Sequence, residues 1–444
     1  METVITKDML AQFEERFDAD RANALAMNAV TANGISAAAK NYQMEREVTH
    51  DFSVSLEHDK VTDQKKSGRC WMFAALNVLR ARVMKNTNLD SFELSQSYPA
   101  FYDKLEKANY FLESILNTLD EPTDGRLIAH LLRAPLNDGG QWDMLCSIVE
   151  KYGLVPKSAM PESAVSSATN EFCAYATEKL REDACILRKA YACGVSFEEL
   201  RQKKEAMLET IYDMLCICYG KPPKTFTFEY RDKDKNFHRD TNLTPKTFYE
   251  KYVGVDLKEY ISLINAPTVD KPYYRSYSVE YLGNVAEGRL VRYVNLPIEE
   301  LKKAAIAQMQ DGEPVWFGCD VGKRLNRDGG IMDPGTFGVE NLFHTTFGMT
   351  KAERLDYGQS LMTHAMVFQG VNLDEEGRPN RWQVENSWGE ESGKNGYLVM
   401  SDSWFDEYMY QVVVNKKHLP KEAVEAYESE PIMLKPWDPM GSLA

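Results

Sequence analysis

Cys70 stands where a polar loop meets an apolar helix, a place that suits a nucleophile. The loop contains Ser67 and Gly68, and residues 71–84 are strong helix formers that are apolar on nearly every face. This pattern predicts a buried helix with Cys70 in its first turn. Free N–H groups and the positive dipole end at a helix N-terminus stabilise a thiolate, which is the nucleophilic form of cysteine.

Three further residues could complete a site for acyl transfer to a thiol. Gln64 precedes Cys70 in the same loop, and its amide could donate to a developing oxyanion beside the N–H of Cys70. His364 is expected at the start of a strand, where it could act as the base that holds the thiolate as an ion pair. Asn386 is expected at the end of a later strand, where its amide oxygen could accept the ring proton of the histidine.

Taken one at a time, these residues have ordinary structural interpretations. Free cysteine is among the most buried residue types, and a buried strand histidine is usually structural. The combination favours chemistry, because the histidine could serve as base, the asparagine could orient it, and Trp388 could screen their hydrogen bond from water.

Two adjacent glycines, Gly139 and Gly140, end a loop just before a predicted helix at residues 143–152. Glycines let a ligand backbone approach closely and pair with main-chain groups, so this loop is a candidate for binding substrate. By themselves they are more typical of a plain turn before a helix.

Composition excludes several other classes of function. The 444 residues carry a net charge of −15 and no concentrated basic stripe, which argues against nucleic acid and anionic membranes as partners. Neither a signal peptide nor a stretch of about 18 apolar residues is present, so we expect a cytoplasmic protein with eight reduced cysteines. Cys216, Cys218 and His238 lack the spacing of a zinc site, and we expect neither a metal nor a cofactor.

The remaining pattern supplies the elements that would position these residues. Residues 1–60 predict an N-terminal arm packed on the main body, with Leu10, Phe13 and Phe17 at helical spacing. A long helical region follows at 162–219. Strands are expected at 225–230, 314–318, 361–370, 381–386 and 393–400, and the less periodic stretch at 240–290 could form a surface for other subunits.

These motifs together resemble the papain-like cysteine peptidases. The resemblance rests on a glutamine, then Ser-Gly-Arg-Cys-Trp opening a helix, then His-Ala on a strand, then Asn-Ser-Trp-Gly followed by Gly-Tyr, in that order. His364 follows Cys70 at about twice the separation of about 130 to 150 residues found in secreted papain-like enzymes. That long insertion, with Arg69 in the nucleophile motif and no disulfide cysteine, is similar to the bleomycin hydrolase and bacterial aminopeptidase C family.

The resemblance implies an α+β, papain-like two-lobed fold with large helical and hook-like insertions. It implies a helical lobe that carries the cysteine, a β-rich lobe that carries the histidine and asparagine, and assembly into a homohexamer. The expected divisions are an N-terminal arm at 1–60, the helical lobe at 61–160, an inserted oligomerisation region at 161–290, the β-rich lobe at 291–430 and a C-terminal arm at 431–444.

Carried over by motif, Cys70 is the nucleophile, His364 the general base and then acid, Asn386 the orienting residue and Gln64 an oxyanion donor. Gly139 and Gly140 fall where papain-like enzymes pair with the substrate backbone. The C-terminal arm would lie in the cleft, with the Ala444 carboxylate facing the free α-ammonium of a peptide. The resemblance therefore implies a cytoplasmic cysteine aminopeptidase that releases N-terminal residues.

Two alternatives share this fold. A non-catalytic scaffold is disfavoured because all four catalytic positions are intact. An endopeptidase would use the same chemistry with a cleft open at both ends, so the C-terminal arm is the feature that discriminates between the two activities. Nucleic-acid binding is disfavoured by the charge.

Overall fold

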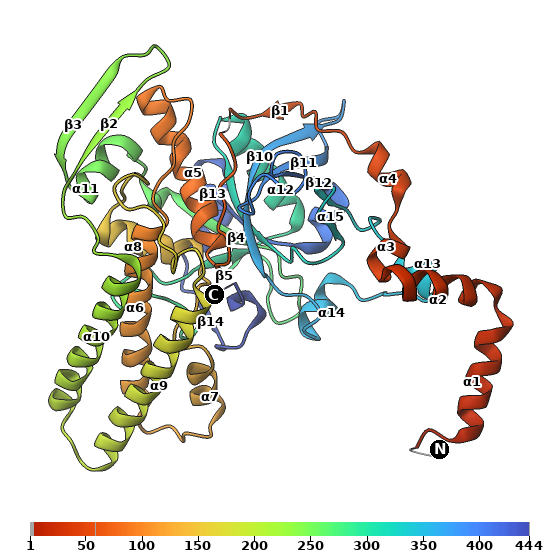
Figure 1. Ribbon diagram of the computed structural model, residues 1–444, viewed down its shortest axis with the longest axis horizontal. Coiled ribbons are helices and arrows are strands. Elements are labelled where there is room, and N and C mark those ends of the chain that lie inside the picture. The colour runs from red at the N-terminus through yellow and green to blue at the C-terminus, as the bar shows by residue number, and fades with distance from the viewer. Residues whose placement is uncertain (1–3, 58, 444) are drawn as a thin grey trace.

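The computed structural model describes residues 4–57 and 59–443, which form a helical half and a sheet half side by side (Figure 1). The helical half contains α5 (Cys70–Thr87), α6 (Ser97–Leu116), α7 (Arg126–Arg133), α8 (Trp142–Tyr152), α9 (Asn170–Ala192) and α10 (Phe197–Tyr219). Helix α5 is buried along most of its length, as its apolar pattern predicts.

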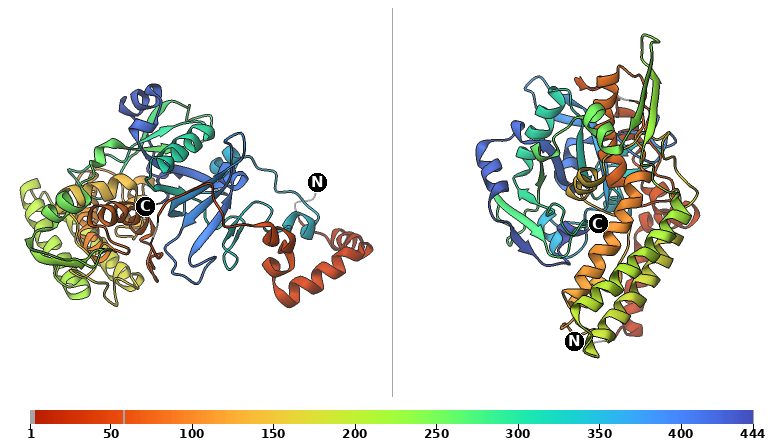
Figure 2. Two further views of the ribbon diagram at one scale, coloured as in Figure 1. Left: turned by 90° about the horizontal axis from the view of Figure 1, so that it is seen from above. Right: turned by 90° about the vertical axis from the view of Figure 1, so that its left-hand side faces the viewer.

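Helices α9 and α10 form a long pair that packs on α6 and extends away from the sheet half (Figures 1 and 2). Each buries one apolar stripe and exposes charged residues. Ser196 and Glu199 form a capping box at the start of α10. The helical region predicted at 162–219 is therefore confirmed.

A hairpin of β2 (Phe226–Arg231) and β3 (Phe237–Leu243) follows α10 and leads into α11 (Pro245–Phe248). Its buried Phe228 packs edge-on against Phe248 and Tyr252. These aromatic contacts fix the hairpin to the helical half.

The sheet half is built on one 12-stranded sheet with the order β14-β5-β6-β4-β13-β7-β10-β11-β12-β9-β8, and β1 pairs with β10. These strands are β1 (Val54–Ser55), β4 (Tyr260–Ile264), β5 (Arg275–Val279), β6 (Tyr293–Asn295), β7 (Val315–Cys319), β8 (Leu325–Asn326), β9 (Ile331–Met332), β10 (His364–Leu373), β11 (Pro379–Glu385), β12 (Tyr397–Ser401), β13 (Met409–Asn415) and β14 (Ile432–Leu434). The α-helices that follow β6 in the chain are α12 (Ile298–Gln310), α13 (Val339–Phe343), α14 (Lys351–Asp356), α15 (Asp402–Tyr408) and α16 (Lys421–Glu428).

This sheet begins earlier in the chain than the boundary expected at residue 290. Strands β4 and β5 lie within the stretch taken as an inserted region, yet β4 pairs with β13 and β6, and β5 pairs with β6 and β14. All five residues of β4 are buried. Because tyrosines and prolines interrupt the alternation around them, the sequence pattern did not reveal these short strands.

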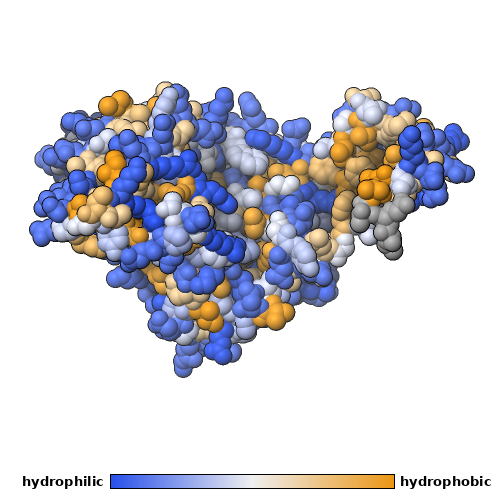
Figure 3. Space-filling view, turned by 90° about the horizontal axis from the view of Figure 1, so that it is seen from below, coloured by the Kyte–Doolittle hydropathy of each residue, from blue (hydrophilic) through white to orange (hydrophobic). Residues whose placement is uncertain are grey.

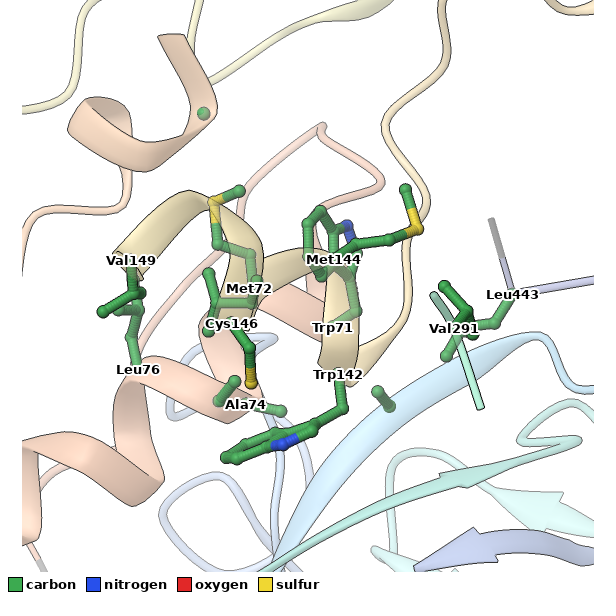
Figure 4. Close-up of a cluster of buried hydrophobic side chains, with 14 of the residues drawn as sticks. Trp71, Met72, Ala74, Leu76, Trp142, Met144, Cys146, Val149, Val291 and Leu443 are labelled. Atoms are coloured by element: carbon green, nitrogen blue, oxygen red, sulfur yellow. The ribbon is translucent and has the colours of Figure 1, made fainter. Parts of the chain in front are cut away.

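The two halves meet along α5, which packs against β10 and β7. The Trp316 indole donates to the carbonyl of Trp71 at 3.0 Å, and Arg80 forms a buried ion pair with Glu385 at 2.6 Å. A close-up of the core shows Trp71 and Trp142 within one apolar cluster that also includes Leu443 (Figure 4). The nucleophile-bearing helix is thus held against the strand that begins at His364.

The N-terminal arm packs on the main body only in its later part, where Lys40 bridges to Phe337 and β1 pairs with β10, and not in its first two helices as the sequence predicted. Helices α1 (Lys7–Ala19) and α2 (Arg21–Asn33) contain no buried residue, and they project beyond the sheet half on α3 (Ile35–Ala39) and α4 (Tyr42–Glu47) (Figure 1). Apolar side chains gather on the arm in the space-filling view (Figure 3). The amphipathic pattern showed that one face of these helices is apolar, but it did not show which surface packs against that face.

The C-terminal segment returns to the junction of the two halves. Strand β14 pairs in parallel with β5, and a short 3-10 helix follows at Pro439–Gly441. Met440 and Leu443 are buried at 0% and 5% exposure. Among the helices of the described residues, none is long and apolar enough to cross a membrane.

Candidate active site

Cys70 is the first residue of α5 and lies at the junction of the two halves with 5% of its surface exposed. The backbone N–H groups of Trp71 and of Ala365, the second residue of β10, face its sulfur and act to lower the pKa of the thiol. The predicted position in the first turn of a buried helix is confirmed. The helix dipole and these donors both favour negative charge on the sulfur.

His364 and Asn386 form the hydrogen bond that the sequence predicted. His364 Nε2 lies 2.8 Å from Asn386 Oδ1, and the same oxygen accepts from the Ser387 N–H at 2.8 Å. Since an amide oxygen only accepts, Nε2 carries the ring proton and Nδ1 remains as the basic nitrogen. The Ser387 contact fixes which way the Asn386 amide faces.

Trp388 covers this hydrogen bond on the sheet side. Its ring centroid lies 4.9 Å from that of His364, with an interplanar angle of 35°. The Arg327 guanidinium lies in turn 4.4 Å from the Trp388 ring centroid. The screening role expected for Trp388 therefore has a structural basis, and Arg327 is an additional charge that the sequence did not indicate.

Burial sets the protonation of the two reacting groups. It raises the pKa of the Cys70 thiol to about 11, and the N–H groups of Ala365 and Trp71 oppose this rise. Burial lowers the pKa of His364 to about 4; Asn386 opposes the fall, and the positive charge of Arg327 adds to it. Burial thus works against the ion pair predicted from the sequence and favours a neutral thiol beside a neutral imidazole.

Gln64 lies between the nucleophile loop and the loop that follows Asn386. Its Nε2 donates to the Ser67 carbonyl at 2.5 Å, and its Oε1 accepts from the Ser387 hydroxyl at 2.6 Å. The amide carries two hydrogens on Nε2, so one remains for a further acceptor. Its role as an oxyanion donor stays a prediction.

The glycine loop is held against the nucleophile helix. The Trp71 indole donates to the Asp138 carbonyl at 2.6 Å, and Lys107 donates to the Gly139 carbonyl. A Cβ on Gly140 would lie 2.5 Å from the Trp71 ring. Glycine at position 140 is therefore required for this close approach, which the plain-turn interpretation does not explain.

Asp138 is a residue of the site that the sequence analysis missed. Its carboxylate forms an ion pair with Lys104 at 2.5 Å and accepts from the Gly68 N–H at 2.7 Å and from Thr169. These contacts hold its pKa well below the usual range, against the effect of burial. Asp138 thus ties the glycine loop to the loop that precedes Cys70, and its partners are too far apart in sequence to give a signal.

The C-terminal segment lies against the glycine loop and accepts a hydrogen bond from it. The Gly140 N–H donates to the Leu443 carbonyl at 3.1 Å. Ser442 donates to the Met362 carbonyl at 2.9 Å, and Tyr293 donates to the Met440 carbonyl at 3.2 Å. Ala444, expected to face the substrate amine, lies outside the described residues.

Comparison with known proteins settles the family. Residues 4–441 match the Peptidase C1-like family. The chain is 51% identical to aminopeptidase C of Listeria monocytogenes, covering 100% of both chains, and 44% identical to bleomycin hydrolase of Rattus norvegicus, covering 99% of each. It aligns with the crystal structure of PepW from Lactobacillus rhamnosis with a TM-score of 0.98 at 51% identity, covering 100% of both chains.

The chain belongs to the Peptidase C1-like family. This confirms the resemblance to the bleomycin hydrolase and aminopeptidase C family, and with it the prediction of a papain-like fold of mixed helix and sheet and of a peptidase of the cysteine type.

Arg69, the departure from the motif of secreted papain-like enzymes, has a defined role in this family member. Its guanidinium binds both carboxylate oxygens of Glu162, at 3.1 and 2.8 Å, and donates to the Ser166 carbonyl at 2.6 Å. The side chain is 2% exposed. A buried bidentate pair of this kind fixes the nucleophile loop to the segment that leads into α9.

Proposed function

We propose that this protein is a cysteine aminopeptidase that releases N-terminal residues from peptides through a thioester acyl-enzyme. The Cys70 sulfur attacks the scissile carbonyl carbon while its proton passes to His364 Nδ1. The imidazolium then gives this proton to the leaving amine as the C–N bond breaks. Water, deprotonated by the same nitrogen, hydrolyses the thioester and restores the thiol.

The remaining site residues have supporting roles in this proposal. Asn386 keeps the proton of His364 on Nε2, so that Nδ1 is free to exchange protons with the thiol and the amine. The Cys70 N–H and the second amide hydrogen of Gln64 are the proposed donors to the oxyanion. Gly139 and Gly140 are proposed to pair with backbone at the edge of the cleft.

The observation that carries the aminopeptidase assignment is the hydrogen bond from Gly140 to the Leu443 carbonyl. A peptide that extended past the scissile bond on its amino side would need this N–H, and here the chain's own C-terminal segment holds it. Buried Met440 and Leu443 anchor that segment. When the residue that carries the scissile carbonyl is the first residue of the peptide, its free amine is the end of the substrate, and no backbone has to pass the C-terminal segment. This supports N-terminal release. Full-length relatives named aminopeptidase C support the same assignment.

An endopeptidase is the alternative that shares this chemistry. It requires the C-terminal segment to leave the cleft, and the contacts of Ser442 and Tyr293 with backbone carbonyls oppose that movement. The Ala444 carboxylate remains the proposed partner of the substrate amine.

We further propose a cytoplasmic homohexamer. The support for assembly is the arm, where Phe13 and Phe17 are 45% and 42% exposed on a helix that contains no buried residue. Apolar helices of this kind gain by packing against another subunit. The five divisions of the chain also remain a proposal, with the sheet-rich part beginning at Tyr260, the first residue of β4, instead of at residue 291.

A panel of fluorogenic aminoacyl amides, each tested beside its N-acetylated form, examines the proposal. We expect hydrolysis of the free-amine forms only, and loss of all hydrolysis in Cys70→Ala with an unchanged assembly. Hydrolysis of N-acetylated forms at equal rates would favour the endopeptidase. Activity in Cys70→Ala would reject the assignment of the nucleophile.

A further inference from the structure

Arg327 places a positive charge one ring away from the residue that protonates the leaving group. It lies in the loop between β8 and β9, and its guanidinium rests on Trp388, which in turn rests on His364. The Arg327 charge acts on His364 directly, since it helps to lower the pKa of the imidazole. The Trp388 ring therefore contacts both the Arg327 guanidinium and the imidazole ring of His364.

Arg327 forms no ion pair with a carboxylate in the described part of the chain. Two acidic side chains, Glu45 and Asp63, are paired with lysines instead. Glu45 binds Lys40 at 2.8 Å, and the neighbouring Asp328 also acts on Lys40. Asp63, which forms a β-bridge with Trp388, binds Lys65 at 2.5 Å.

The two sides of the site determine in which direction a bound peptide runs. Leu443 fills the edge at Gly140, in the helical half, so the amino end of the substrate stops there. The leaving amine must lie against His364, because that residue supplies its proton. The leaving group therefore begins beside the imidazole and continues along the sheet half, where Trp388 and Arg327 lie.

We propose that Arg327 binds the C-terminal carboxylate of the leaving group, which makes dipeptides and other short peptides with a free C-terminus the preferred substrates. This rests on the proposed aminopeptidase activity. A residue spans about 3.5 Å of chain, so the carboxylate of a single leaving residue lies close to the scissile amide and within reach of a long side chain. A guanidinium can bind both carboxylate oxygens through its N–H edge while one of its flat faces remains on an aromatic ring.

The preference should appear mainly in turnover. An imidazolium forms on His364 during the reaction, and the Arg327 charge opposes it. A carboxylate bound to Arg327 offsets that repulsion at the step where the imidazolium is needed. A neutral leaving group leaves the repulsion in place.

The experiment compares Ala-Gly, Ala-Gly-amide and Ala-Asp-amide, with alanyl-aminomethylcoumarin as a substrate whose leaving group has no charge. For the wild type we expect kcat/KM for Ala-Gly to exceed that for Ala-Gly-amide by about tenfold at low salt, and this ratio to fall as salt is added. The measurement with Ala-Asp-amide shows whether a side-chain carboxylate can replace the terminal one.

Three variants complete the test. Arg327→Gln should bring the ratio of acid to amide close to one, and Arg327→Lys should keep part of it because the charge remains without the planar fork. Lys421→Gln removes an equal charge from an 89% exposed side chain on α16 and should leave the ratio unchanged. A ratio near one in the wild type, or an undiminished ratio in Arg327→Gln, would overturn the proposal. A wild type inactive on alanyl-aminomethylcoumarin and on every peptide would instead overturn the proposed function.

Discussion

The backbone N–H of Gly140 donates to the carbonyl of Leu443 at 3.1 Å, so the chain binds its own C-terminal segment at the edge of its cleft. Gly140 can take part only because it lacks a Cβ, which would meet the Trp71 ring. If substrate backbone pairs with Gly140, as we propose, it competes with the C-terminal segment for this one donor. That competition would then decide whether peptides are cut at their ends or within.

Deleting residues 441–444 should open the cleft to N-blocked and internal peptide bonds and lower activity on free-amine aminoacyl amides. The deletion removes the Leu443 carbonyl from Gly140 and the Ser442 contact with Met362. The measurement is kcat/KM on free and N-acetylated substrates. Unchanged kinetics on both classes would mean that this segment has no part in substrate selection.

Asn386→Ala should lower kcat on the order of 10² without abolishing activity, because the imidazole keeps its chemistry but loses the acceptor that fixes its tautomer. The Ser387 N–H also loses its acceptor. Thermal unfolding beside steady-state kinetics separates the two effects. Full turnover in a variant of unchanged stability would remove Asn386 from the mechanism.

Gln64→Ala should act mainly on kcat, with a loss on the order of 10² to 10³, the usual effect of deleting one oxyanion donor. Gln64 also joins two loops through Ser67 and Ser387, so Ser387→Ala is the matched control. That variant removes the donor to Gln64 Oε1 but leaves the amide hydrogens in place. Equal losses in the two variants would point to loop structure instead of oxyanion binding.

The sequence predicted the parts of this site that local pattern determines. The step from a polar loop to an apolar run placed Cys70 at the start of α5, and alternation placed His364 at the start of β10 and Asn386 just after β11. Each of these three positions was predicted from neighbouring residues alone. The family resemblance then indicated that the three residues belong to one site.

Features that depend on distant partners were not predicted. Asp138 contributes to the site through its contacts with Lys104 and Thr169, and these residues come close to it only in the folded chain. Arg327 matters because the β8–β9 loop carries it onto Trp388. The N-terminal arm shows the same limit, since an amphipathic pattern does not identify the surface that it will cover.

The acid limb of kcat/KM should lie near pH 4, well below the ordinary imidazole pKa of about 6.5. Burial lowers the pKa of His364, so the free base is present above about pH 4 and is lost as pH falls through that value. Arg327→Gln removes a positive charge that lowers this pKa and should move the acid limb to higher pH. An acid limb at pH 6 to 7 in the wild type would contradict the burial of the base.

Replacing both Phe13 and Phe17 with Asp should reduce the assembly to smaller species. These side chains lie on an arm with no buried residue in α1 or α2, and a groove of about 740 Å³ runs between the arm and α13. Charges there would oppose burial against a second subunit. Light scattering at micromolar concentration measures the mass, and Tyr357→Asp, at a 79% exposed position outside both the arm and the region 161–290, is the control. We expect an oligomer for the wild type and the control; a wild-type mass near 50.7 kDa, or an oligomer that survives both Phe substitutions, would show that the apolar face of the arm does not hold subunits together.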